Sequence, residues 1–515
     1  MTSTHPDHLE VEDTYEVPDS AQVPAWTGVE AVAAVHGPTE HHLEATYFDT
    51  HDLALVRAGV TLRRRAGGDD AGWHLKLPTR RGRHEAHEPL GRAVGAVPKP
   101  YRTAVRLLTR GQALTPVATV RTSRRDYELV AEDGSVLARL SDDRVRAELP
   151  ADERFEAETR TWREWELEVV TGDTELLRRA AVVLADAGAH PAAWQSKLAR
   201  ALGDRYHAGA VPQRPRPRPK GPARDVLGPR LAALVEDLRR CDPLVRRGAP
   251  DAVHRMRVAV RRLRSALATF RPLLDREVSE PLREELRWLG RRLGEARDAE
   301  VLRDRLGTGL ARVAPAPTGP VRRIVEDRLG ARADAALTRA QDGLLEDRYF
   351  ALMDALQSLA MAPPWSGKAE ARVRKVLRRR VRHDWKRLDD RVARLQAPDE
   401  PRAGVQQRDR ALHEVRKAAK RVRYAAEPLV EVYGKPAEQF VTGLRRVQSV
   451  LGEHHDIQVV RAELLGLDEL AAAAGSTFAL GVLYAREGHR ADRLEQRFAR
   501  RWHRASRGRR RSWLV

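Results

Sequence analysis

Charged side chains recur at every second residue in several runs of the first part of the chain, and each run carries one sign. A β-strand points alternate side chains to one face, so each run places like charges together on a strand face. Carboxylate oxygens bind hard divalent cations, and Arg and Lys bind phosphate oxygens. These residue types suit metal-assisted phosphoryl chemistry. The acidic runs contain Glu10, Glu12, Glu164, Glu166 and Glu168. The cationic strands are those of Arg63 and Arg65, of Lys76, and of the region around Arg121 and Arg124.

The elements that must position these charges are strands, with helical interruptions expected near residues 88–114 and 174–202. An ordinary sheet with a solvated outer face explains any single strand of this kind. Several strands share the pattern here and segregate by sign, which favours a closed barrel that turns the charged faces inward around a polar lumen. The segments before and after the turn Glu132-Asp133-Gly134 read as a strand pair.

The order of the motifs in this part resembles the CYTH family, the triphosphate tunnel metalloenzymes. The matching segments are Glu10-Val11-Glu12, TLRRR, HLKLP, SDD and WREWELEV, and the similarity extends to the closing segment around Ser196-Lys197. The resemblance covers nearly all of residues 1–207. It implies an antiparallel tunnel barrel of eight strands. It also implies Mg²⁺- or Mn²⁺-dependent hydrolysis of inorganic tripolyphosphate, a nucleoside triphosphate or thiamine triphosphate.

The resemblance also implies a role for individual residues. The metal would be held by Glu10, Glu12, Asp142, Glu166 and Glu168, with Asp143 as the rival of Asp142. The triphosphate would be bound by Arg63, Arg65, Lys76 and Arg124, and the catalytic residues would be Glu10, Glu12 and Lys76. The family usually opens with Glu-x-Glu-x-Lys, whereas this chain has Thr14 at the Lys position. Metal binding is still expected, and a tunnel without turnover is the alternative.

A second pattern lies on a helix predicted over residues 253–270. Val253, Met256, Val260, Leu263 and Leu267 follow helical spacing and form an apolar seam. One residue further along, a cationic stripe repeats the same spacing without an acid to balance it. Like charges at this spacing repel, so an anion from outside the chain would stabilise the stripe. The stripe consists of His254, Arg257, Arg261 and Arg264.

The same two stripes recur later in the chain. Leu412, Val415, Ala419, Val422 and Ala426 repeat the apolar seam. LGEARDAEV and LGEHHDIQV follow the two stripes at nearly equal distances, which indicates an internal duplication. Two surface helices of an Arg-rich protein are the simpler alternative. The second cationic stripe consists of His413, Arg416, Lys420 and Arg423.

The repeated motifs, each followed by LGExxD, resemble the CHAD family, the conserved-histidine α-helical domain. The resemblance implies that both cationic stripes bind inorganic polyphosphate. Few aromatic residues are available as stacking platforms, although nucleic acid remains a rival polyanion. We expect His254 and His413 to contact phosphate, with a structural hydrogen bond as the alternative. We expect the recurring Asp298 and Asp456 to orient Arg side chains.

Charge distribution and Pro-rich breaks define the domain organisation of the 515-residue chain. Its net charge is +20, yet residues 1–207 hold more acidic than basic residues, so a polyanion partner is expected for the second part. Cys241 is the single cysteine, which excludes an intramolecular disulfide. We expect an α+β multidomain protein without a membrane span, located in the cytoplasm, where polyphosphate granules are a candidate site of association. The expected parts are an antiparallel β tunnel barrel with flanking helices at 1–207, a Pro/Arg-rich linker at 208–224, an all-α duplicated four-helix bundle at 225–507 with repeats near 225–360 and 365–507, and a frayed basic tail at 508–515.

Together these expectations describe a triphosphate hydrolase fused to a polyphosphate-binding domain. The expected partner is inorganic polyphosphate or a short-chain triphosphate. A non-catalytic polyphosphate-binding protein is the first alternative, and a nucleic-acid-binding protein is the second.

Overall fold

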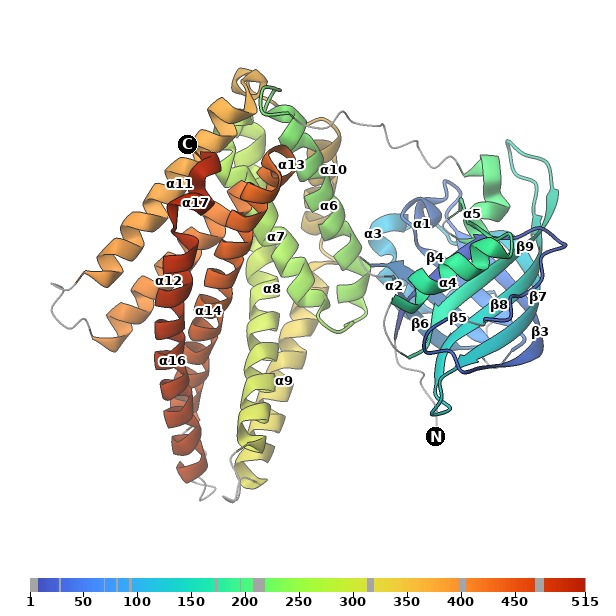
Figure 1. Ribbon diagram of the computed structural model, residues 1–515, viewed down its shortest axis with the longest axis horizontal. Coiled ribbons are helices and arrows are strands. Elements are labelled where there is room, and N and C mark those ends of the chain that lie inside the picture. The colour runs from blue at the N-terminus through green and yellow to red at the C-terminus, as the bar shows by residue number, and fades with distance from the viewer. Residues whose placement is uncertain are drawn as a thin grey trace. The chain divides into compact units, whose positions relative to one another are not determined.

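A computed structural model shows two compact units, Met1–Pro212 and Gln213–Val515 (Figure 1). Residue 207, the predicted domain boundary, and most of the predicted linker at 208–224 lie outside the described residues. Among the residues that the structure describes, no helix combines the length and apolar character needed to cross a membrane. The described residues are 8–26, 29–68, 70–79, 82–91, 95–171, 175–194, 196–206, 218–312, 319–397, 404–467 and 477–514.

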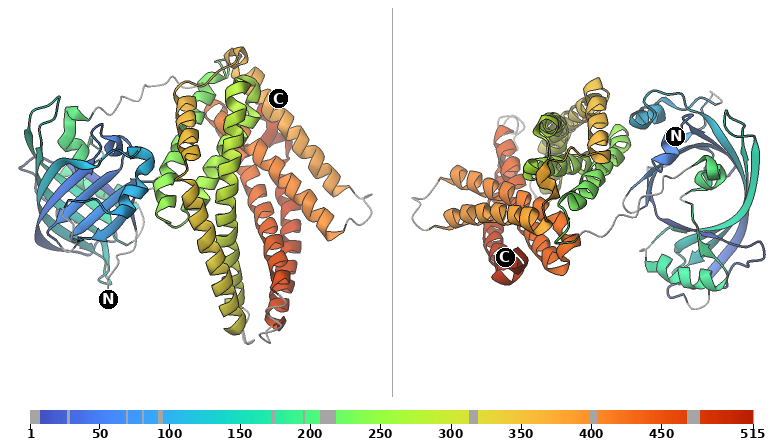
Figure 2. Two further views of the ribbon diagram at one scale, coloured as in Figure 1. Left: turned by 180° about the vertical axis from the view of Figure 1, so that it is seen from behind. Right: turned by 90° about the horizontal axis from the view of Figure 1, so that it is seen from above.

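One antiparallel sheet forms the first unit, in the strand order β1-β6-β5-β4-β3-β7-β8-β9-β2-β10. Val11 alone separates β1, which pairs with β6, from β2, which pairs with β9. This short join closes the sheet into the predicted barrel, whose curvature is visible in the right-hand view of Figure 2. The strands are β1 His8–Glu10, β2 Glu12–Glu16, β3 Ala34–Asp49, β4 Thr61–Ala66, β5 Gly72–Pro78, β6 Arg83–Pro89, β7 Thr115–Val130, β8 Val136–Leu149, β9 Glu158–Val169 and β10 His190–Pro191.

The eight strands implied by the resemblance are recovered when β1 and β2 are counted as one interrupted strand and the two-residue β10 is set aside. Helices lie in the two regions where interruptions were expected. Asp49 caps the short helix α1, because its carboxylate accepts hydrogen bonds from the backbone N–H groups of Leu55 and Val56 at 2.8 and 2.9 Å. The helices are α1 Ala54–Arg57, α2 Lys99–Ala104, α3 Arg106–Thr109, α4 Glu175–Asp186 and α5 Lys197–Leu202.

Alternation along the strands creates two apolar layers in this unit. On the outside, α4 packs on a core that includes Leu140, Trp165 and Leu167. On the inside, α5 packs against Val120, Ala147 and neighbouring strand residues. Ser196 starts α5 by accepting a hydrogen bond from the backbone N–H of Ala199 at 3.1 Å. The apolar part of α5 therefore fills one section of the lumen and leaves another section for charged side chains.

The second unit is helical, and its two repeats match the predicted duplication. Both apolar seams are buried, from Val253 to Leu267 and from Leu412 to Ala426, so the predicted core faces are confirmed. In the described residues each repeat carries one helix more than the predicted four: α10 in the first, which packs on α6 and α8, and the four-residue α13 in the second. The first repeat contains α6 Arg224–Arg246, α7 Ala252–Thr269, α8 Arg276–Ala311, α9 Gly319–Gly343 and α10 Asp347–Met361. The second contains α11 Val373–Gln396, α12 Val405–Ala426, α13 Val430–Tyr433, α14 Lys435–Gly466 and α16 Thr477–Ala505.

The basic tail is ordered, so the expectation of fraying is wrong. It forms α17 Gly508–Arg511 and a 3₁₀ turn at Ser512–Leu514. Trp513 packs against Tyr433 and Phe440, with ring centroids 5.3 and 5.6 Å apart. The guanidinium of Arg382 donates to the carbonyl oxygen of Leu514 at 2.6 Å. One aromatic residue near the end of a basic segment thus provides the apolar contact that holds the tail.

Candidate functional site

Three carboxylates converge inside the barrel, from the neighbouring strands β8 and β9. Asp143, Glu164 and Glu166 each offer an oxygen, and these oxygens lie within 4.8 Å of one another. The ammonium group of Lys197, at the start of α5, lies 2.9, 2.7 and 2.5 Å from the three carboxylates in that order. Arg124 on β7 contacts Asp143 and Glu166, each at 2.6 Å. The lumen therefore holds a compact network of three acids and two bases.

Glu166 and Lys197 stay ionised in this network although they are buried. Burial by itself would raise the pKa of Glu166, but the charges of Lys197 and Arg124 outweigh it and hold this pKa well below its ordinary value. Burial would lower the pKa of Lys197, yet the three carboxylates hold it well above the usual value. Both directions follow from opposite charges at contact distance in a site with little water.

The donor set of this cluster fits a divalent cation. All three ligands are carboxylate oxygens, which Mg²⁺ and Mn²⁺ prefer. Lys197 occupies the space between them, so its ammonium group stands where a cation would be held. Of the predicted metal ligands, Glu166 belongs to the cluster. Glu12 and Glu168 are paired in register on β2 and β9, while the side chain of Glu10 lies outside the described residues.

Asp142 is a wrong prediction, and its rival Asp143 takes the position in the lumen. The carboxylate of Asp142 accepts hydrogen bonds from Arg163 at 2.8 and 2.9 Å and from the indole N–H of Trp165 at 3.1 Å. Trp165 belongs to the outer core beneath α4. Neighbouring residues on a strand point to opposite faces, so Asp142 points out of the lumen when Asp143 points into it. Glu164 and Lys197 complete the cluster, and neither of them was assigned a role in the site from the sequence.

The predicted phosphate-binding residues all line the barrel interior, in two places. Arg63 and Lys76 border a narrow cavity of about 30 Å³ together with Glu12, Thr14 and Glu166. Thr14 is paired in register with Glu166, so the residue that departs from the family motif lies beside the carboxylate cluster. Lys76 also lies 3.6 Å from Glu85.

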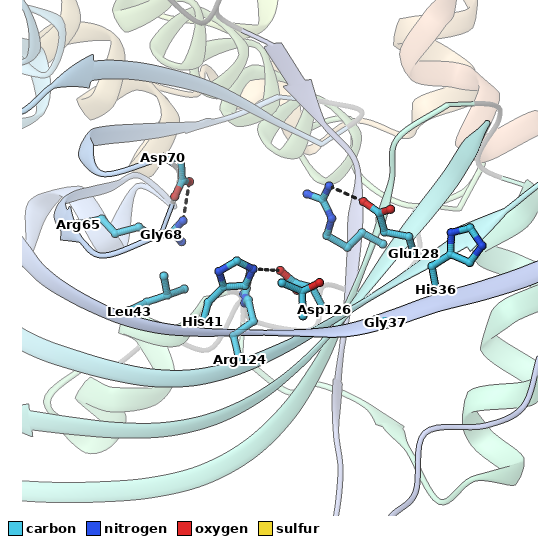
Figure 3. Close-up of a pocket in the computed structure, with 12 residues that line it drawn as sticks. His36, Gly37, His41, Leu43, Arg65, Gly68, Asp70, Arg124, Asp126 and Glu128 are labelled. Atoms are coloured by element: carbon cyan, nitrogen blue, oxygen red, sulfur yellow. Dashed lines mark hydrogen bonds and ion pairs between the residues drawn. The ribbon is translucent and has the colours of Figure 1, made fainter. Parts of the chain in front are cut away.

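Arg65 and Arg124 border a wider cavity of about 400 Å³ (Figure 3). This volume lies in the range of roughly 300–1,000 Å³ that is usual for ligand sites. Arg65 is paired with Asp70 at 2.5 Å, and His41 lies 3.6 Å from Asp126 across the same cavity. Because Arg124 lines this cavity and also bonds Glu166, it joins the wide cavity to the carboxylate cluster.

We expect the Lys197→Met variant to test whether the cluster can exchange its ammonium group for a metal ion. Removing one partner of a buried ion network costs about 3–5 kcal/mol of unfolding free energy, so the variant should melt at a lower temperature in EDTA. Mg²⁺ or Mn²⁺ should raise its melting temperature more than that of the unmodified chain. The exposed Lys99→Met is the control, and equal responses to metal would contradict the proposed ligand set.

In the second unit, the two cationic stripes meet on the neighbouring helices α7 and α12. Lys420 is half-buried, and burial together with Arg416, Arg261 and Arg257 lowers its pKa to about 6. Two of these arginines belong to the first repeat, so cations of both repeats act on one ammonium group. Arg261 also donates to the hydroxyl of Tyr424 on α12, at 3.2 Å. We refer to Arg257, Arg261, Arg416 and Lys420 as the cationic face.

The glycines of the two LGE motifs lie beside arginines of this face. The guanidinium of Arg257 lies near Gly294, where an added Cβ would meet it at 3.8 Å, and Arg416 lies near Gly452 at 3.6 Å. Arg257 also contacts Asp298 at 2.6 Å, as expected of an aspartate that orients an arginine. Each of these arginines thus packs beside the LGE glycine on another helix of its own repeat.

The predicted histidines lie at the edge of the cationic face. His413 stacks near His455, with ring centroids 4.5 Å apart. Burial and nearby cations lower the pKa of His413 and bring that of His455 to about 4. Burial and Arg297 likewise lower the pKa of His254. These rings are therefore neutral at pH 7 without an anion, and an added phosphate would favour their protonation.

Arg423 is a wrong prediction as a polyphosphate ligand, because its guanidinium is used inside the protein. It is 8 % exposed and donates to Gln448 and Glu427, each at 2.9 Å. Arg264 also differs from expectation, since its charged neighbours are Arg287, Arg283, Glu284 and Arg291 of α8 rather than residues of α12.

Replacing Arg423 with Met should therefore affect stability rather than binding. We expect a loss of about 3–5 kcal/mol of unfolding free energy, because Glu427 loses a buried partner. The affinity of the folded fraction for polyphosphate should stay unchanged, as measured by titration below the melting transition. Lys417→Met, an exposed change on the same helix, is the control. If the variant lost affinity for polyphosphate while its unfolding free energy stayed unchanged, Arg423 would be a polyphosphate ligand after all.

The two units together define a class of protein: a closed tunnel barrel with charges of both signs in its lumen, followed by a duplicated helical bundle with a cationic face. Residues 9–187 match the CYTH domain and residues 229–465 match the CHAD domain. The chain belongs to the proteins that combine these two domains in this order.

Several known proteins are similar to the chain. Two uncharacterised proteins of Mycobacterium tuberculosis, from strains CDC 1551 and H37Rv, are each 38% identical over 506 residues, which cover 95% of this chain and 94% of theirs. PptA from Streptomyces chartreusis is 24% identical and covers 55% of this chain and 99% of its own, with a TM-score of 0.46. The CHAD domain of the plant Ricinus communis is 26% identical and covers 56% and 95%, with a TM-score of 0.45.

Proposed function

We propose that this protein is a metal-dependent triphosphate hydrolase that also binds polyphosphate. One observation carries the proposal for the tunnel: three carboxylates within 4.8 Å of one another share the barrel interior with Lys197 and with four cations expected to bind phosphate. Mg²⁺ or Mn²⁺ bound there would offset the charge that develops on the transferred phosphoryl oxygens. The four cations are Arg63, Arg65, Lys76 and Arg124.

The residues of the chain divide the work in this proposal. Asp143, Glu164 and Glu166 would hold the ion, and Glu12 would support it from the adjacent strand. Arg63 and Lys76 bind phosphate oxygens close to the cluster, while Arg65 and Arg124 bind them in the wider cavity, in bidentate geometry where their guanidinium forks allow. Lys197, which contacts these carboxylates, would have to give them up to a bound ion, and its ammonium group would then be available to the anionic substrate.

A non-catalytic triphosphate holder is the second candidate function for the tunnel. Two observations favour it: Thr14 stands at the position of the family Lys, and Lys197 already neutralises the carboxylates that a metal would need. In this candidate the tunnel binds a short anion through the same arginines without cleaving it.

For the second unit, the proposal is that the cationic face binds inorganic polyphosphate. Mutually repelling cations from both repeats meet there, and the pKa of Lys420 is lowered by burial and by this repulsion. A dense line of phosphate charge relieves the repulsion without requiring aromatic platforms. The same chemistry would accept a nucleic-acid backbone, so competition at fixed salt must separate the two polyanions.

The experiment that tests the proposal is phosphate release by the full-length chain from tripolyphosphate, ATP and thiamine triphosphate. Each substrate is supplied with Mg²⁺ or Mn²⁺, and EDTA serves as the control. Release that requires metal supports the hydrolase. If no phosphate is released from any of the three substrates while polyphosphate still binds in a filter or fluorescence assay, the protein is a non-catalytic binding protein.

A further inference from the structure

A second cluster of metal-ligand atoms lies in the helical unit, on three adjacent helices of the second repeat. Asp409 on α12, His454 on α14 and Glu495 on α16 each offer one ligand atom, and these atoms lie within 4.8 Å of one another. His454 Nε2 is 3.5 Å from Glu495 Oε1 and 3.7 Å from Asp409 Oδ1. None of these residues belongs to the cationic face or to the tunnel.

The separations between these atoms suit a shared ion better than hydrogen bonds. Hydrogen bonds from nitrogen to oxygen are usually about 2.7–3.2 Å long, so both contacts of Nε2 are long. Indeed His454 is 4 % exposed, and its Nε2 has no hydrogen-bond partner. Two ligands at about 2.1 Å from one ion are about 3.0–3.4 Å apart in octahedral or tetrahedral geometry. A small inward shift of the carboxylates would complete such a site.

The internal duplication shows that helix packing does not require this imidazole. His454 lies two residues after Gly452, and Ala296 lies at the same distance after Gly294 in the first repeat. Both side chains are equally buried, at 4 % exposure. The helix pair therefore accepts a methyl group at this position in one repeat and a ring with an unpaired nitrogen in the other. An unpaired buried polar atom costs stability, so an additional partner would account for its presence.

The surroundings support both access and orientation. Asp409 and Glu495 remain 23% and 22% exposed in their side chains, so an ion can reach the cluster from solvent. Arg408 donates to Glu495 Oε2 at 2.6 Å, which leaves Oε1 directed at His454. Such support of a ligand by a neighbouring donor is usual at metal sites. One imidazole with two carboxylates suits Zn²⁺ or Mn²⁺ better than Mg²⁺, which prefers oxygen ligands alone.

We propose that Asp409, His454 and Glu495 bind one divalent transition-metal ion that links α12, α14 and α16. The ion would act as a structural clamp in the second repeat, separate from the metal of the tunnel. The first repeat has no counterpart at two of the three positions, because Pro250 and Ala296 stand where Asp409 and His454 would align.

The test counts Zn²⁺ and Mn²⁺ bound to the full-length chain after chelator treatment, by equilibrium dialysis with elemental analysis. The background carries Glu166→Gln, which weakens the tunnel site. We expect about one ion per chain, its loss in His454→Ala, and an affinity lowered at least tenfold in Glu495→Gln. Zn²⁺ should raise the melting temperature of the parent but not of His454→Ala.

His489→Ala is the matched control, because it removes an exposed imidazole from α16 and should leave the bound ion in place. His454→Ala should fold, since Ala296 occupies the equivalent position in the first repeat, and circular dichroism checks this. Unchanged metal content and thermal response in both folded His454→Ala and Glu495→Gln would overturn the proposal. If His454→Ala does not fold, an unchanged metal affinity of Glu495→Gln would by itself overturn the proposal.

Discussion

The Glu166→Gln variant should lose metal-dependent phosphate release from tripolyphosphate by about 10²–10³-fold, the size of effect seen when one preorganised charge is removed from an active site. The neutral amide is a weak metal ligand. It also no longer offsets the positive charges of Arg124 and Lys197, which both contact the Glu166 carboxylate. Asp143→Asn should behave in the same way, because its carboxylate shares the same two partners. Initial rates with Mg²⁺ or Mn²⁺ measure both effects.

Glu148→Gln is the matched control for these variants. It removes one carboxylate from the same strand as Asp143, but Glu148 pairs with Arg121 at the surface, where an ion pair contributes little. Its activity should equal that of the unmodified chain. Activity retained by Glu166→Gln and Asp143→Asn would place the metal elsewhere in the lumen, for example at Glu12 and Glu168.

The strand pattern was sufficient to predict the barrel and most of its charged lining. Lys76 lies between Leu75 and Leu77, and Arg63 and Arg65 occupy one face of their strand, so the face that turns inward follows from the sequence. The segment around Asp142 and Asp143 is different, because two adjacent acids cannot both follow the alternation. Arg163 determines which of the two acids faces outward, because it binds Asp142 on the outer face. Local periodicity cannot predict a partner that lies more than twenty residues away in the sequence.

Lys197 was missed for a related reason. Its sequence neighbourhood indicates a short helix, and nothing in that segment shows that the helix enters a barrel and reaches strands β8 and β9. The same limit applies to Arg423 in the helical unit. Its spacing matches the cationic stripe, but Gln448 and Glu427 draw it inward. Helical periodicity assigns a residue to a face, whereas its partners across the bundle determine whether its charge is available.

The double variant Arg416→Glu/Lys420→Glu should abolish polyphosphate binding. It reverses two of the four charges of the cationic face and leaves Arg257 and Arg261 beside new carboxylates. Neutralising a phosphate contact weakens binding and lowers its salt dependence, and reversal adds repulsion. Lys417→Glu is the control, because this exposed residue of the same helix already pairs with Glu414. Affinity for long-chain polyphosphate at fixed salt measures the effect. An unchanged affinity in the folded double variant would move the binding surface away from α7 and α12.

The lowered pKa of Lys420 adds a pH dependence that distinguishes this face from an ordinary basic surface. Without ligand, Lys420 is neutral above about pH 6, because burial and Arg416, Arg261 and Arg257 outweigh Asp456. Bound polyphosphate favours its protonation and raises its pKa, so binding takes up a proton at pH 7–9. Affinity should therefore fall as pH rises, by up to about tenfold per pH unit. Without ligand, His413 and His455 are neutral across this range, since their pKa values lie below the ordinary 6.5. The slope should disappear in Lys420→Met, and a slope that persists there would assign the proton to another group.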